Sequence, residues 1–113
     1  MPLLKGTLDV LVLKALSWGP MHGFEVTRWI EDSSKGEFPI EAAALLQALH
    51  RLEERRLLTA AWGVTGNNRR ARYYSVTPAG RTHLKAETES LKGTIAALSA
   101  ILSARTAAAA GHR

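Results

Sequence analysis

Apolar residues recur along the chain at spacings that predict helices, then strands, then one more helix. Residues 8–18 are apolar on almost every side, so a helix formed by them must be covered on more than one face. A second helix is expected over about 21–33 and a third over about 41–55. The third has a stripe at positions i, i+3, i+4 and i+7, and this stripe is expected to be buried: Leu45, Ala48, Leu49 and Leu52.

Two strands are predicted next, over 57–64 and 72–76, around a turn at 63–70. Thr77 and Pro78 then predict the start of a long helix, because threonine caps helices well and proline is tolerated at the first helical position. Apolar residues in this helix follow a heptad seam in which Thr88 fills one position: Leu84, Leu91, Ile95, Leu98 and Leu102. Such a seam favours pairing with a second copy, and packing back on the same domain is the alternative.

The order of these elements predicts one mainly α-helical fold. Three short helices, a two-stranded β wing and a long helix describe a winged helix-turn-helix followed by a C-terminal dimerisation helix. We expect the DNA-binding domain to span residues 1–76, the dimerisation helix 77–105 and a frayed tail 106–113.

Positive charge is concentrated in the middle of the chain. Residues 41–85 carry eight Lys or Arg against three Asp or Glu, net +5, whereas residues 1–40 carry net −1 and residues 86–113 net +1. Within the basic block, Arg69, Arg70 and Arg72 cluster at the predicted turn. A localised basic block is typical of a surface that meets nucleic acid, although a solvated turn would also tolerate it.

Several other function classes lack the residues they need. The chain has no cysteine, and its four histidines show no zinc-ligand spacing, so neither a metal site nor another cofactor is expected. It has no glycine-rich phosphate loop and no nucleophile motif, which argues against an enzyme. No apolar run reaches the roughly 18 residues of a membrane helix, and no export signal is evident, so we expect a cytoplasmic protein without membrane contact.

Four segments of the chain together resemble the PadR-type transcriptional regulators, a family named for a repressor that responds to phenolic acids. They are "LLKGTLDVLVLKALSWGPMHGFEV", "ALHRLEERRLL", "AAWG" and "NNRRARYYSVTPAGR". The resemblance covers about residues 3–102 and places the chain among compact members with a short C-terminal helix. It implies a homodimeric repressor that binds a palindromic operator in double-stranded DNA. In several relatives a small hydrophobic effector releases the DNA.

The resemblance and the helical wheel together select candidate DNA-binding residues on the third helix and the wing. They are Ala43, Gln47, His50, Arg51, Asn68, Arg69, Arg70, Arg72 and Tyr73. The chain departs from the family at Leu46, where a DNA-contacting tyrosine is usual, and at Arg56, where a glycine usually follows the third helix. Leu46 could instead join the core or the dimer, which would weaken DNA binding. In that case the chain would be a protein-interaction module or an effector sensor on the same scaffold.

Dimerisation is expected to use the first and last helices. The candidate residues are Leu8, Leu11, Leu84, Leu91, Ile95, Leu98 and Leu102. A space between these helices could take a flat aromatic or hydrophobic effector, as in the family's effector-binding members. For this pocket we expect Leu11, Trp18 and Ile95, with plain dimer packing as the alternative.

Overall fold

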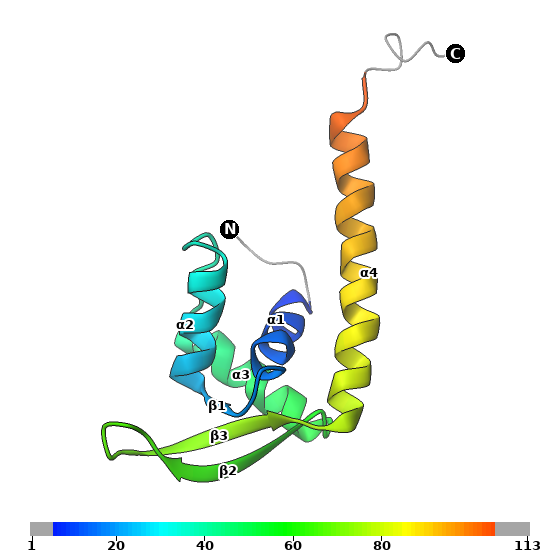
Figure 1. The fold of residues 1–113 in the computed structure, drawn as a ribbon. Coiled ribbons are helices and arrows are strands. Elements are labelled where there is room, and N and C mark those ends of the chain that lie inside the picture. Colours follow the sequence, from blue (N-terminus) through cyan, green and yellow to red (C-terminus); the bar gives the residue numbers. More distant parts are fainter. Residues whose placement is uncertain (1–5, 106–113) are drawn as a thin grey trace.

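A computed structural model describes residues 6–105 of the chain. The elements follow the order α1 (Thr7–Leu16), β1 (Met21–His22), α2 (Gly23–Ser33), α3 (Ala42–Glu54), β2 (Leu58–Val64), β3 (Arg70–Val76) and α4 (Pro78–Ser103) (Figure 1). The mainly helical fold with a small antiparallel sheet confirms the predicted fold class. The tail predicted over 106–113 lies outside the described residues.

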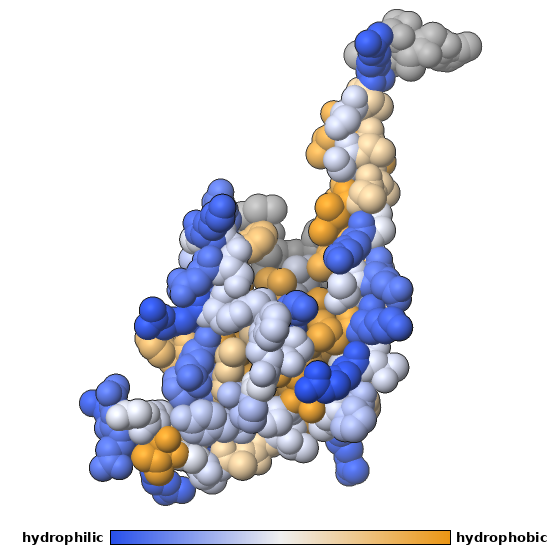
Figure 2. Space-filling model, in the orientation of Figure 1, coloured by the Kyte–Doolittle hydropathy of each residue, from blue (hydrophilic) through white to orange (hydrophobic). Residues whose placement is uncertain are grey.

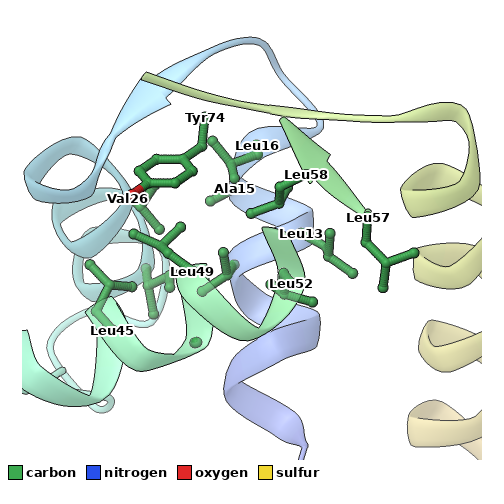
Figure 3. Packing of buried hydrophobic residues seen from close by; sticks show 13 residues of the cluster. Leu13, Ala15, Leu16, Val26, Leu45, Leu49, Leu52, Leu57, Leu58 and Tyr74 are labelled. Carbon is green, nitrogen blue, oxygen red and sulfur yellow. The ribbon is translucent and has the colours of Figure 1, made fainter. Parts of the chain in front are cut away.

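The hydrophobic core is built around α1. Val12, Leu13 and Leu16 have less than 2% of their surface exposed, and they pack against α2, α3 and the sheet. The predicted stripe of α3 is buried on this core, which confirms that prediction. Figure 3 shows Tyr74 of β3 closing the cluster on the side of the sheet. Because α1 touches every layer, its apolar surface holds the domain together.

The start of the second helix was predicted wrongly. Met21 and His22 form a strand that pairs with Tyr74 and Tyr73, so the sheet has three strands in the order β1-β3-β2. The helix begins at Gly23 because His22 caps it: its Nδ1 atom accepts a hydrogen bond from the backbone N–H of Glu25. The Glu25 carboxylate in turn accepts from the N–H of His22, which completes a capping box.

The wing is longer than predicted, since β3 begins at Arg70 rather than Arg72. Two backbone hydrogen bonds close its tip. The N–H of Thr65 donates to the Arg69 carbonyl at 2.8 Å, and the N–H of Asn68 donates to the Thr65 carbonyl at 2.9 Å. Asn68 has a φ of 60°, a left-handed conformation that asparagine tolerates better than most residues. The turn closes the hairpin, and its two strands extend well beyond the core (Figure 1).

The third helix ends in a left-handed residue although no glycine is present. Arg56 has a φ of 61° and donates its N–H to the Glu53 carbonyl, while the N–H of Leu57 donates to the Leu52 carbonyl. These two bonds form a Schellman motif in which Leu52 and Leu57 are both buried. Arg56 therefore adopts the conformation that the family's usual glycine would adopt without strain.

The long helix begins as predicted. Thr77 accepts a hydrogen bond from the Gly80 N–H at its hydroxyl, and Pro78 is the first helical residue. Leu84 packs against the core, but the second half of α4 extends past the domain (Figure 1). Figure 2 shows apolar surface along the side of α4 that faces the domain. Across residues 6–105, no helix combines the length and the apolarity needed to cross a membrane.

Replacing Arg56 by glycine should stabilise the protein. The change relieves a left-handed residue that carries a Cβ atom, so the free energy of unfolding should rise by up to about 1 kcal/mol in urea titrations. Arg55→Gly is the matched control, because Arg55 has a φ of −80°. That variant should lose stability, by less than the roughly 1 kcal/mol of a glycine in a helix interior, because Arg55 is the C-cap residue of α3. If both variants were equally destabilised, the left-handed assignment would be wrong.

Candidate nucleic-acid interface

The outward side of α3 presents four exposed side chains in a row. Ala43, Leu46, Gln47 and His50 follow the spacing i, i+3, i+4 and i+7, so they form one stripe, called here the α3 stripe. Leu46 lies within this stripe with 50% of its surface exposed, so it does not join the core. Two of the four side chains can hydrogen-bond to base edges or phosphates, and two are apolar.

The wing tip carries two exposed arginines. Arg69 follows the turn directly, and the guanidinium of Arg70 lies 4.7 Å from the centre of the Trp62 ring. This cation–π contact holds Arg70 against the strand, while Trp62 itself stays 63% exposed. We name Arg69 and Arg70 the wing-tip arginines. They combine exposure with positive charge at the point of the fold farthest along the wing (Figure 1).

Arg72 is placed differently, within β3 opposite Trp62 and beside the end of α3. Its guanidinium makes an ion pair with Glu53 of α3 at 3.0 Å, through two hydrogen bonds, and lies 5.9 Å from the Tyr74 ring centre. The pair joins the wing to the end of the helix that carries the α3 stripe. Arg72 is therefore an anchor between these two elements as well as a candidate DNA contact.

Tyr73 follows Arg72 in β3, so its side chain lies on the opposite face of the sheet. Its ring packs against Gly63, where a Cβ atom would lie 2.7 Å from the ring, and against His22 at a centroid distance of 5.4 Å. The sequence predicted Tyr73 as a DNA-binding residue. The structure places it on the central strand β3, with β1 on one side and β2 on the other.

Arg51 forms a second ion pair, between α3 and α1, at the surface of the domain. Its Nη2 atom lies 2.7 Å from a carboxylate oxygen of Asp9 in the first turn of α1. The hydrogen bond to Asp9 raises the pKa of Arg51 above its ordinary value. Arg51 thus links α3 to α1. It lies one helical turn after Gln47 of the α3 stripe.

A largely apolar groove runs between α1 and α4. It encloses about 650 Å³, and its apolar lining includes Leu11, Leu84, Leu91 and Ile95. Further along α4, Leu98 and Leu102 are exposed, as is Ile101, which the predicted seam did not include.

Two residues predicted for this region lie elsewhere. Leu8 packs near Pro39 and Ile40 on another side of α1, and Trp18 does not line the groove, because α1 ends two residues before it. Trp18 is largely exposed, and the Nζ atom of Lys14 lies 5.6 Å from its ring centre. Of the three residues predicted for an effector pocket, Leu11 and Ile95 line this groove and Trp18 does not.

Two exposed aromatic residues were not predicted for this surface. Trp62 lies on the same side of β2 as Leu58 and Ala60. It lies beyond the core, however, because the wing is long. Phe24 in the first turn of α2 is 66% exposed and was not singled out. Within residues 6–105, no cluster of three His, Cys, Asp or Glu side chains is placed to hold a metal ion.

Taken together, the α1–α3 core, the hairpin and the exposed third helix define a winged helix-turn-helix protein. The model of the transcriptional regulator PadR-like family matches residues 12–86, two thirds of the chain. The chain therefore belongs to this family, whose members are transcriptional regulators rather than enzymes.

Solved structures of other regulators share the fold. A PadR family transcriptional regulator from Eggerthella lenta is 28% identical, with a TM-score of 0.74 over 89% of this chain and 86% of that one. A transcriptional regulator from Clostridium thermocellum is 25% identical, with a TM-score of 0.76 over 84% and 92%. PadR of Bacillus subtilis, in complex with operator DNA, is 17% identical, with a TM-score of 0.64 over 72% of this chain and 46% of that one.

Removing the carboxylate of Asp9 should lower stability through the pair with Arg51. Asp9→Asn should reduce the free energy of unfolding by about 0.5 to 1 kcal/mol, since one partner of the pair is half exposed. Urea unfolding of Asp9→Asn, Arg51→Gln and the double variant should show a coupling of that size, with the exposed Asp32→Asn as control. Additive effects in this cycle would mean that the pair contributes nothing.

Proposed function

We propose that the chain is a homodimeric repressor that binds a palindromic operator through α3 and the wing. The observation that carries the proposal is the Arg72–Glu53 ion pair, which fixes a cationic hairpin to the helix bearing the exposed α3 stripe. A stripe that enters the major groove and a wing that meets the flanking phosphates need this fixed arrangement. The operator complex of the Bacillus subtilis relative supports the same use of the fold.

Affinity in this proposal comes mainly from charge. Arg69 and Arg70 are free to meet phosphates, whereas Arg51 and Arg72 already pair with carboxylates of the protein. In the α3 stripe only Gln47 and His50 offer hydrogen bonds, so direct reading of bases by polar groups is limited. Binding should therefore depend strongly on salt concentration, because each neutralised phosphate releases counterions.

The second copy in this proposal covers the groove between α1 and α4. Leu98 and Leu102 continue the apolar lining of that groove onto the free half of α4, where this copy of the chain offers them little cover. A partner helix laid along this seam would bury them and would give two copies of α3 related by a two-fold axis. Successive major grooves lie about 34 Å apart, and the dimer would have to match that spacing.

Selection of bound sequences from a random duplex pool should enrich a palindrome, and the wing-tip arginines should set its salt dependence. The Arg69→Ala/Arg70→Ala double variant removes up to four phosphate contacts per dimer. The slope of log affinity against log salt should then become shallower by about 3 to 4. Fluorescence anisotropy with the selected duplex measures this slope.

Two controls make the wing test specific. Lys35→Ala/Arg105→Ala removes the same charge far from the wing and should leave the slope nearly unchanged. Arg72→Ala should change it by less than one unit, because its guanidinium is paired with Glu53. A pool that yields no bound duplex at all would contradict the proposed function.

A charge placed in the α4 seam should separate the two copies. Leu98→Asp should convert the dimer to a monomer at micromolar concentrations, because the carboxylate would be buried without a partner. Light scattering gives the mass directly. Ala100→Asp on the opposite side of α4 is the matched control and should remain dimeric. If Leu98→Asp kept the dimer mass, or the unaltered chain were monomeric, this interface would be wrong.

A further inference from the structure

An apolar groove opens between the first turns of α2 and α3, next to the α3 stripe. Phe24 and Leu46 both line it, together with Ile40 and Ala42, and it encloses about 370 Å³. Phe24 and Leu46 are at least half exposed, although each is large enough to fill a core position. Exposed side chains of this size at a binding surface indicate contact with an apolar group of the ligand.

The residues around this apolar groove have the chemistry needed to contact the major groove of DNA. The guanidinium of Arg28 lies 5.8 Å from the Phe24 ring centre, which places a cation beside the apolar surface. Gln47 and His50 of the α3 stripe continue the surface with hydrogen-bonding groups. The nearby carboxylate of Glu25 accepts a hydrogen bond from the backbone of its own capping box. Phosphates line the edges of a major groove, and base edges form its floor.

Only one apolar group is displayed on base edges in the major groove, the 5-methyl group of thymine. A helix that carries Leu46 within its exposed stripe gains most by lying against such methyl groups. The leucine also has no hydrogen-bonding group with which to read a guanine or an adenine edge. Leu46, which stands where the family usually has a tyrosine, thus offers an apolar contact in place of a polar one.

We propose that Leu46, supported by Phe24, reads thymine methyl groups and makes them a specificity determinant of the operator. The inference rests on the proposed function, since it requires α3 to lie in the major groove. It goes beyond that function by naming the base and the atom that are recognised. A protein partner on the same apolar surface is the competing occupant, but the adjacent arginine and the continuous α3 stripe favour duplex DNA.

Replacing thymine by deoxyuracil tests this contact, because the change removes the methyl group and keeps every hydrogen-bonding group of the base. Each thymine of the selected operator is replaced in turn, and affinity is measured by anisotropy. At the contacted position of each half-site, affinity should fall about fourfold per methyl group removed. Thymines outside the protected region should show no change.

The variants assign the effect to the side chain. Leu46→Ala should bind the thymine and deoxyuracil operators almost equally, and roughly as well as the unaltered protein binds the deoxyuracil operator. Gln47→Ala, one residue along the same stripe, should keep the fourfold difference. Both positions are exposed, so neither change should impair folding.

Each contrary outcome has its own meaning. Tight operator binding with no deoxyuracil effect at any position would overturn the inference and leave the proposed function standing. A deoxyuracil effect that persists in Leu46→Ala would assign the methyl contact elsewhere and also overturn it. If Leu46→Ala changed only the association state in light scattering, the surface would be a protein contact instead. Absence of any duplex binding would overturn the proposed function and this inference together.

Discussion

The first helix is apolar on almost every side, and the rest of the molecule is arranged to cover it. Its buried residues Val12, Leu13 and Leu16 hold α2, α3 and the sheet on one side, and Leu11 faces the groove against α4 on another. Removal of the apolar surface of this helix from water supplies the main driving force for the fold. The side that the domain itself leaves partly open is the side where the proposed partner binds, so folding and assembly depend on the same apolar helix.

Four arginines that look alike in the sequence have different roles in space. Arg51 ties α3 to α1 through Asp9, and Arg72 ties the wing to α3 through Glu53. Arg69 and Arg70 remain at the wing tip, one of them held by Trp62. These two ion pairs thus connect α1, α3 and the wing. Arg69 and Arg70 remain available for phosphates. Repulsion among the clustered arginines is reduced because Arg72 pairs with the Glu53 carboxylate and Arg70 lies over the Trp62 ring.

Local patterns predicted most of the fold, and non-local pairings account for what they missed. The spacing of Leu45, Ala48, Leu49 and Leu52 gave the buried side of α3, and Thr77 with Pro78 gave the start of α4. The strand at Met21 and His22 could not be predicted, since two residues carry no period and pair with residues about fifty positions away. The partners of Arg51 and Arg72 lie 42 and 19 positions away, so their anchoring roles were hidden as well. The exposure of Trp62 follows from the length of the wing rather than from its own residue type.

In the proposed dimer, two copies joined along α1 and α4 present two α3 stripes and two wings to one duplex. Native mass spectrometry of the protein with its selected duplex tests it most directly, because the mass of the complex gives the stoichiometry. We predict a complex of two chains with one duplex, formed without a detectable complex of one chain. A dominant complex of one chain per duplex would contradict the account.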